Sequence, residues 1–336
     1  MKQLTAALAA LAFVAAASPL HAQDFYAGKQ IVIVVGSAAG GGYDLLARLT
    51  SRHMGKHIPG NPIFVVQNMP AAGSLVAANH LANVAPRDGT MIGLMQRGVL
   101  LAPITNPSAV RYSVTSFRWI GSLASETGVT LAYESAPHRT AKDLFEKELI
   151  IGASAGVDPE TTARLYNALI GTKFKIVMGY NGTTAIGLAM ERGEVQGIAD
   201  WSWSSLKAQR PAWIRDKKVH YLLQGALERD KELPDVPNAL DFVKDDVSRK
   251  VLELYFTQKT VARPLLTPPD VPADRVDLLR RAFLALDKDA AFHEEAKKSN
   301  LDLQLLAGEA VDKVIGLIAN ASPEVKDKLA AAMKPQ

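Results

Sequence analysis

A glycine-rich stretch near the N-terminus has the composition of an anion-binding loop. Five apolar residues, Ile31 to Val35, predict a buried strand, and from Tyr43 onward apolar residues recur at helical spacing. Between them, Gly36 to Gly42 carry almost no side chains. A strand, such a loop and a helix N-terminus expose backbone N–H groups beside a partial positive charge. The stretch is therefore either an anion site built from backbone or a plain tight turn. In the first case, a bulky side chain at Gly41 is expected to block the site.

Small polar and aromatic residues follow later predicted strands in the same way. Ser154 lies in one small-residue turn, and Tyr180 to Thr184 lie in another. Their hydroxyl and amide groups would either bind a ligand or cap the helices that follow, and both readings stay open. Trp201 and Trp203 follow a further strand, at the end where α/β folds bind ligands. Since they are two residues apart, at most one of them is expected to face such a site.

An enzyme is the main alternative, because Gly152 to Gly156 match the G-x-S-x-G turn of serine hydrolases. Ser154 would be the nucleophile, and it would need an acid and a histidine downstream. The downstream histidines are His220, in an apparent strand, and His293, in a charged helix, and no HGGG-type segment is present. The sequence also lacks nucleotide-binding glycine motifs and metal-ligand spacings. We therefore expect no catalytic residue, no metal and no cofactor.

The composition and the N-terminus limit the class of protein. The 336 residues include 38 Lys and Arg against 34 Asp and Glu, spread along the chain, so no nucleic-acid patch is expected. Lys2, the apolar run from Leu4 to Ala17 and the small-residue site Leu20-His21-Ala22 predict a cleaved secretory signal peptide over residues 1–22. There is no cysteine, so neither a disulfide nor a lipid anchor on cysteine is expected. These features predict a secreted protein that relies on its core alone.

The order of the predicted elements indicates two α/β lobes. Three strand–helix units in about the first hundred residues predict a mostly parallel sheet. Extended segments at 118–123 and 129–133 indicate a crossing into a second lobe, which repeats the strand–turn–helix order. A second apolar stretch, Leu254 to Val261, is expected to be an extended return crossing that leads to C-terminal helices. We therefore predict lobe 1 over 23–123 plus 255–336, lobe 2 over 124–254, and a ligand cleft between them.

Four motifs together resemble those of one family. They are Gly40 to Arg48 (GGGYDLLAR), Asn68 to Gly73 (NMPAAG), Asp88 to Ile92 (DGTMI), and Gly179 to Ala185 (GYNGTTA) with Gly193-Glu-Val195. Because it carries these motifs in this order, the chain resembles the periplasmic substrate-binding proteins of tripartite tricarboxylate transporters, the Bug-type receptors. The resemblance implies localisation in the periplasm and a type II periplasmic-binding-protein-like fold, with two α/β lobes joined by two crossing strands.

The resemblance also implies a ligand and partners. One loop of each lobe, Ala39 to Tyr43 and Tyr180 to Thr184, would hold the carboxylate of a di- or tricarboxylate or related organic acid. The membrane permease subunits of such a transporter would be the partners of a monomeric receptor. A sensor protein that presents its ligand to a membrane kinase would look the same and stays open. The candidate ligand-binding residues are Ala39, Gly40, Gly41, Gly42, Tyr43, Asn68, Gly73, Ser74, Arg97, Ser154, Tyr180, Asn181, Gly182, Thr183, Thr184 and Trp201.

Overall fold

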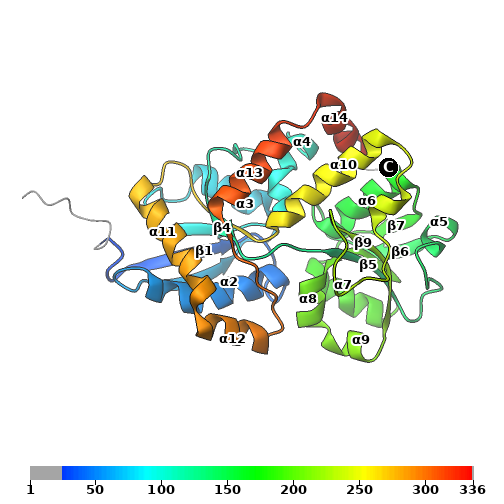
Figure 1. Cartoon of the computed structure of the whole chain (residues 1–336), viewed down its shortest axis with the longest axis horizontal. Coiled ribbons are helices and arrows are strands. Elements are labelled where there is room, and N and C mark those ends of the chain that lie inside the picture. The colour runs from blue at the N-terminus through cyan, green and yellow to red at the C-terminus, as the bar shows by residue number, and fades with distance from the viewer. Residues whose placement is uncertain (1–24, 335–336) are drawn as a thin grey trace, which may run out of the picture.

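Two mixed β-sheets, each with helices packed on both faces, make up the computed structural model of the chain (Figure 1). The structure describes residues 25–334, so the signal peptide predicted over residues 1–22 lies outside the described residues. Within that described range, no helix combines the length and the apolarity that crossing a membrane requires. The predicted α/β fold class with two lobes is confirmed.

Sheet A forms the first lobe and has the strand order β11-β4-β10-β3-β1-β2. Strand β1 pairs in parallel with β2 and β3, whereas β10 runs antiparallel between β3 and β4. The strand bounds are β1 (Gln30–Val35), β2 (Ile63–Asn68), β3 (Met91–Leu94), β4 (Arg118–Ser122), β10 (Pro264–Thr267) and β11 (Leu306–Ala307).

Strand β1, which lies between β3 and β2, is buried on both faces of sheet A, as its unbroken apolar run predicts. Ile31, Ile33 and Val35 pack on one face with the apolar sides of three helices, and Val34 packs on the other face with two. The first three helices are α2 (Gly42–His53), α11 (Ala273–Ala285) and α12 (Ala290–Lys298), and the other two are α3 (Leu75–Asn83) and α13 (Gly308–Ala319).

Sheet B forms the second lobe and has the order β7-β6-β8-β5-β9. Helices α6 and α10 cover one face, and α7, α8 and α9 cover the other. The strands are β5 (Gly128–Tyr133), β6 (Leu149–Gly152), β7 (Phe174–Val177), β8 (Gly197–Ser202) and β9 (Val219–Gly225). The helices are α5 (Asp143–Glu146), α6 (Asp158–Ile170), α7 (Gly182–Glu191), α8 (Trp203–Gln209), α9 (Pro211–Arg215) and α10 (Asp246–Thr257).

The return crossing differs from its prediction. The stretch Leu254 to Val261 is helical: α10 runs through its first half, and a 3-10 turn, Gln258–Val261, completes it. Asp245 caps α10 by accepting a hydrogen bond from the Ser248 N–H group. Val251, Leu252 and Tyr255 recur at helical spacing and are buried. The apolar run is therefore one stripe of an amphipathic helix, which a short apolar window cannot distinguish from a strand.

The two lobes pack against each other along one side of the molecule. A single apolar cluster runs from α3 and α13 of the first lobe to α6 and α10 of the second. The C-terminal helix α14 (Pro323–Ala332) contacts α6, α10 and the short helix α4 (Ala102–Thr105), and lies above both lobes in Figure 1. The predicted division at residues 123/124 and 254/255 separates the strands of the two sheets, and as a division into domains it stays a proposal.

Candidate functional site

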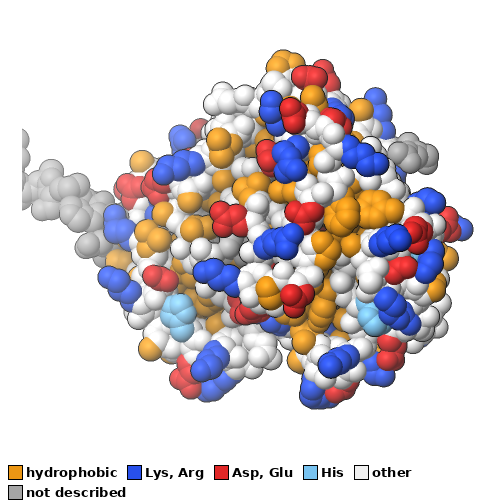
Figure 2. Space-filling view, turned by 45° about the vertical axis from the view of Figure 1, so that its right-hand side comes forward, with side chains coloured by type: hydrophobic (Ala, Val, Ile, Leu, Met, Phe, Trp, Pro, Cys, Tyr) orange, Lys and Arg blue, Asp and Glu red, His pale blue; other side chains and the backbone are white. Residues whose placement is uncertain are grey.

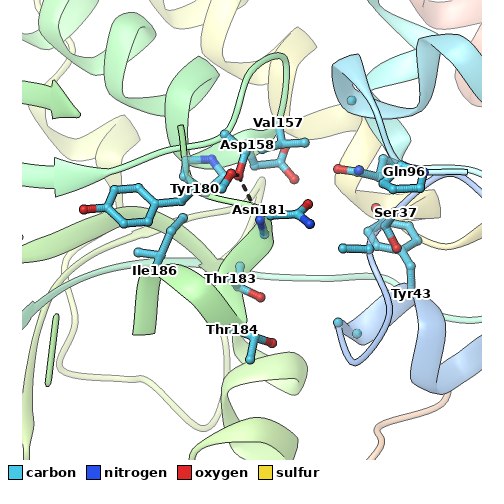
Figure 3. A pocket seen from close by; sticks show the side chains of 18 of the residues that line it. Ser37, Tyr43, Gln96, Val157, Asp158, Tyr180, Asn181, Thr183, Thr184 and Ile186 are labelled. Carbon is cyan, nitrogen blue, oxygen red and sulfur yellow. Dashed lines mark hydrogen bonds between the residues drawn. The ribbon is translucent and has the colours of Figure 1, made fainter. Parts of the chain in front are cut away.

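A cavity of about 430 Å³ lies between the two lobes, at the carboxyl ends of β1, β6, β7 and β8 (Figure 3). In Figure 3, Ser37, Tyr43 and Gln96 approach it from the first lobe, and Asn181, Thr183 and Thr184 approach it from the second. The carboxyl end of an α/β sheet is the usual place for a ligand, because loops and helix N-termini gather there. The structure therefore gives the protein an interlobe site of the size that small organic molecules occupy.

The first-lobe wall of the cavity is the loop that leads into α2. Gly40 makes the turn with φ +78°, and no side chain caps the helix at Gly41. The Asp44 carboxylate instead holds the loop from behind, since its Oδ2 accepts hydrogen bonds from the Gly40 N–H group and from Arg48 Nε, each at 2.9 Å. No described residue accepts a backbone hydrogen bond from the N–H groups of Gly42 and Tyr43. These two donors remain for a ligand.

The second-lobe wall is the loop that leads into α7. Ser154 Oγ braces this loop, because it donates to the Tyr180 carbonyl and accepts from the Gly182 N–H group at 3.0 Å. The hydroxyl groups of Thr183 and Thr184 turn to Gln209 Oε1, at 3.3 and 3.2 Å. Among the residues that the structure describes, none accepts from the Thr183 and Thr184 backbone N–H groups. The second wall therefore offers two backbone N–H donors to the cavity, as the first wall does.

We call the N–H groups of Gly42, Tyr43, Thr183 and Thr184 the amide cradle. These N–H groups lie in the first turns of α2 and α7, which have twelve and ten residues. Neither helix is capped by the side chain of its N-cap residue, and both N-termini line the same cavity. Each helix N-terminus carries about half a positive charge, so the two together balance about one negative charge. Carboxylates and other small anions bind such termini without a buried counter-charge. The chemistry that this arrangement supports is the reversible binding of an anion.

The structure places twelve of the sixteen candidate residues in the cavity wall. These are Ala39, Gly41, Gly42, Tyr43, Gly73, Ser154, Tyr180, Asn181, Gly182, Thr183, Thr184 and Trp201. Trp201 is fully buried and lines the cavity, whereas the Trp203 indole N–H group donates to Glu232 at 2.6 Å outside it. That a bulky side chain at Gly41 blocks the site stays a prediction, but Gly41 does not have left-handed backbone. Its φ is −81°, and an added Cβ would have Ala38 O at 3.5 Å as its nearest contact. The steric constraint lies instead at Gly42, where an added Cβ would come within 2.1 Å of Ser205 Oγ.

Three of the four candidates outside the wall hold the first-lobe loops in place. Gly40 supplies the left-handed turn described above. Asn68 Nδ2 donates to the Ser37 carbonyl and to Asp44 Oδ1, both at 3.0 Å. Ser74 Oγ donates to the Gly36 carbonyl at 2.7 Å and accepts from the Gln96 N–H group. These residues support the cradle from behind.

The fourth, Arg97, joins the lobes. Its buried guanidinium reaches from the first lobe to the second, where Nη2 lies 2.8 Å from Asp158 Oδ2 and 3.7 Å from Asp200 Oδ1. Burial lowers the pKa of Arg97, but Asp158, Tyr43 and Asp200 outweigh burial and raise it beyond its ordinary value. Arg97 is therefore charged, and its charge is committed to the ion pair rather than to the cavity.

Sequence reasoning missed several residues that line the cavity. Asp200, Ser202 and Ser205 surround Trp201 at the end of β8, and their position after a predicted strand was a usable signal. Arg263 had no such signal, because it follows the return crossing and reaches the cavity only through the tertiary fold.

The serine hydrolase alternative finds no support in the site. Ser154 Oγ is held by the loop of α7, as described above. Neither downstream histidine is among the cavity-lining residues of the described chain: His220 lies in β9, and the exposed His293 hydrogen-bonds the Asp287 carbonyl. A serine hydrolase of this type pairs its serine with a histidine, and no histidine lines this cavity within the described residues.

Comparison with known proteins agrees with this description. No family model matches the chain. A curated protein of Agrobacterium vitis, described as "UPF0065 protein in the TAR-I ttuE-ttuC' intergenic region", is 26% identical over 280 residues, which are 80% of this chain and 74% of the relative. The chain resembles the solved structure of the periplasmic binding protein BugD with a TM-score of 0.72 at 22% identity, over 91% of this chain and 98% of that one.

Two further solved structures contain a named ligand. MatC from Rhodopseudomonas palustris, with bound malate, has a TM-score of 0.66 at 21% identity, over 91% of this chain and 99% of that one. A second R. palustris protein, with adipate, has a TM-score of 0.69 at 18% identity, over 91% and 97%. The chain thus has the fold of these binding proteins, and its resemblance to the Bug-type receptors is confirmed.

Proposed function

We propose that the protein is a periplasmic solute-binding receptor that captures a small carboxylate, a di- or tricarboxylate or a related organic acid, for a tripartite tricarboxylate-type transporter. The observation that carries the proposal is the amide cradle, in which two uncapped helix N-termini line one interlobe cavity from opposite walls. Two structural neighbours support a carboxylate, since those proteins hold malate and adipate.

The cellular setting is part of the same proposal. A signal peptide cleaved after Ala22 would deliver a monomer to the periplasm, where membrane permease subunits would receive the ligand. Positive and negative side chains are mixed over the face shown in Figure 2. N-terminal sequencing of the periplasmic protein should begin at or near Gln23, and an intact Met1 in a membrane fraction would contradict this delivery.

Thermal unfolding in the presence of organic acids tests the binding function. The protein is unfolded, freed of ligand, refolded and heated with each acid of a panel and with the corresponding neutral amide. A ligand that binds only the native state raises the midpoint, by the equivalent of about 2.7 kcal/mol at a hundredfold excess over Kd. We expect a rise with at least one acid and none with its amide. Equal responses to acid and amide would exclude the anion site.

A proline substitution tests the cradle itself. Thr183 is the second residue of α7, where proline is tolerated because its missing N–H group needs no helical partner. Thr183→Pro should remove one cradle donor and weaken acid binding by about 10- to 100-fold, the effect of one charge-assisted hydrogen bond. Thr183→Val is the matched control, since it keeps the N–H group and loses only the hydroxyl that donates to Gln209. Equal losses in the two variants would assign binding to the hydroxyl instead.

Catalysis is not part of the proposal. We expect the purified protein to leave generic esters intact, in the wild type and in Ser154→Ala alike. Ester hydrolysis that disappears in Ser154→Ala would restore the hydrolase alternative.

A further inference from the structure

The floor of the cavity offers hydrogen-bond donors that the amide cradle does not use. We call Trp201, Ser202, Ser205 and Arg263 the floor residues, and all four line the cavity. The first three lie at the junction of β8 and α8, and Arg263 lies between the return crossing and β10. The floor thus joins the second lobe to the segment that links the lobes.

Arg263 is held firmly but incompletely paired. Its side chain is 2% exposed, and Nη2 donates to Glu126 Oε1 and to Ser205 Oγ, each at 2.9 Å. The Tyr43 ring stacks on the guanidinium, with 4.1 Å between the guanidinium carbon and the ring centre. Nε is buried without a partner, and Nη1 makes no hydrogen bond to any described residue. Arg263, which lines the cavity, therefore keeps two guanidinium nitrogens without a partner among the described residues.

The other floor residues add donors as well. The Trp201 indole N–H group is buried and has no partner. Ser205 Oγ accepts from Arg263, and Ser202 Oγ accepts from Arg97 Nη1 at 3.4 Å, which leaves each hydroxyl proton for another acceptor. Asp200 also lines the cavity, and its Oδ1 is an acceptor without a hydrogen bond, but this oxygen lies 3.7 Å from the Arg97 guanidinium. Unpaired hydrogen-bond donors therefore outnumber unpaired acceptors at the floor of the cavity.

A surplus of buried donors selects the chemistry of what binds there. An unpaired buried donor is costly, so the floor favours a group that brings several acceptors and no donor. An ionised carboxylate has two acceptor oxygens and no hydrogen, and it matches the planar fork of a guanidinium. An ammonium or hydroxyl group would add a further donor. The floor therefore fits a carboxylate.

The floor and the cradle are close enough for one small ligand to reach both. A Cβ built on Gly42, in the cradle, would lie 2.1 Å from Ser205 Oγ and 3.4 Å from Arg263 Nη2. We propose that Arg263 binds a second carboxylate, at the far end of a short ligand whose first carboxylate occupies the amide cradle. The inference rests on the proposed function, and it makes Arg263 the residue that sets the preference for dicarboxylates over monocarboxylates of equal length.

Titration calorimetry with matched acids tests this role. The ligand pairs are succinate with butanoate, glutarate with pentanoate, and adipate with hexanoate. We expect Arg263→Gln to weaken the preferred dicarboxylate by about 30-fold or more, as for truncation of a buried charge pair. Binding of the matching monocarboxylate should change less than about 3-fold, because the cradle is intact. Arg275→Gln is the matched control. Arg275 also stacks on an aromatic ring, that of Phe25, and also has a buried unpaired Nε, but it does not line the cavity.

Two further variants guard against misfolding. Arg263→Gln with Glu126→Gln keeps the core neutral when the cation is removed, because Glu126 is the buried partner of Arg263. Trp201→Phe removes the indole N–H group together with the rest of the five-membered ring, and loss of this donor should weaken dicarboxylates alone, by about 3- to 10-fold. Equal weakening of both acid classes, or of neither, would overturn the role of Arg263 while leaving the receptor function in place. Failure of the wild type to bind any acid would overturn the receptor function itself.

Discussion

Gly42 is where the cradle and the floor meet, and glycine is needed there for space rather than for backbone conformation. A Cβ would lie 2.1 Å from Ser205 Oγ and 3.1 Å from Ser205 Cβ. We expect Gly42→Ala to displace Ser205, break its hydrogen bond from Arg263 and lower the free energy of unfolding by about 1–3 kcal/mol.

Gly41→Ala is the neighbouring control for this prediction. Its Cβ would make an ordinary contact, 3.5 Å from the Ala38 carbonyl oxygen, so the free energy of unfolding should change by less than about 0.5 kcal/mol. Urea unfolding of both variants measures the difference. The same loss in both would show that the contact with Ser205 is not what constrains Gly42.

Asp44 should make stability depend on acid pH. Burial raises the pKa of Asp44, but hydrogen bonds from Arg48, Gly40 and Asn68 outweigh burial and hold the pKa below its ordinary value. A carboxyl with a depressed folded-state pKa stabilises the fold above its unfolded pKa of about 3.9, and this contribution disappears as the pH falls through the folded-state pKa.

The test for Asp44 is the isosteric variant Asp44→Asn. We expect it to lose about 2 kcal/mol of unfolding free energy at pH 7, as for hydrogen bonds to a charged group, and much less at pH 2. Urea unfolding of wild type and variant at both values measures this. A difference that stays constant with pH would mean that the carboxylate charge is not what braces the loop.

The amide cradle could be predicted from the sequence because its signals are local. Glycine at Gly40 to Gly42 and small polar residues at Thr183 and Thr184 follow predicted strands, and backbone donors need no distant partner. Arg263 could not be predicted in this way. Its partners Glu126 and Tyr43 are far from it in the chain, and no periodic pattern reports such a meeting.

At the scale of elements, predicted strands and helices agree with the structure where apolar residues recur with a clear strand or helix period. The strand predicted over Ile31 to Val35 lies within β1, and the helix predicted from Tyr43 onward lies within α2. The elements that were not predicted include α10, whose apolar stripe suggests an extended segment, and α8, a seven-residue helix with a serine-rich start. Short helices depend on tertiary packing more than on their own propensity, so the sequence carries little signal for them.

The turn between β2 and α3 is a point of contact between the two lobes. Ala72, Gly73 and Ser74 all have left-handed backbone, with φ of +45°, +62° and +76°. A Cβ on Gly73 would lie 2.0 Å from the carbonyl oxygen of Gly156, in the opposite lobe. The two lobes therefore touch here through backbone alone, and any side chain would have to separate them.

We expect Gly73→Ala to hold the lobes apart. Ligand affinity should fall by about 10-fold or more, because a ligand that bridges the walls binds the closed form better than the open one. Stability should fall by only about 1–2 kcal/mol, the cost of alanine in left-handed backbone. Gly98→Ala is the control, since its Cβ would lie 3.9 Å from the same carbonyl oxygen.

Calorimetry and small-angle X-ray scattering with the preferred acid check this prediction. The radius of gyration of the Gly73→Ala variant should stay larger than that of the ligand-bound wild type. Normal compaction with normal affinity would show that the Gly73–Gly156 contact does not limit closure.

At the scale of the whole molecule, the lobes are joined by more than the two crossing segments. The apolar cluster that runs through α3, α13, α6 and α10 is continuous across the lobes, and Leu329 of α14 is fully buried in it. The Tyr43 hydroxyl also ties α2 to the segment that follows the return crossing, since it donates to the Ala262 carbonyl at 2.9 Å and accepts from the Arg97 N–H group at 3.2 Å. Movement of one lobe against the other is therefore constrained on the side of α14, and the opposite walls of the cavity are freer to separate.

The ion pair between Arg97 and Asp158 crosses from one lobe to the other. The Arg97 side chain is 1% exposed, so removing either partner leaves a buried charge poorly paired. Arg97→Gln and Asp158→Asn should each cost about 3–5 kcal/mol of unfolding free energy. The double variant should cost less than the sum of the two by about 1–3 kcal/mol, since neither charge is then left alone.

A double-mutant cycle by urea unfolding measures this coupling. Arg87 and Asp270 form the control pair, because this ion pair is exposed and should couple by less than about 1 kcal/mol. Additive losses at Arg97 and Asp158 would show that Arg97 depends on Asp200 instead. If the pair also favours the closed form, its double variant should bind the preferred acid more weakly than wild type even where both are fully folded, because the differential affinity of the ligand must then supply the whole free energy of closure.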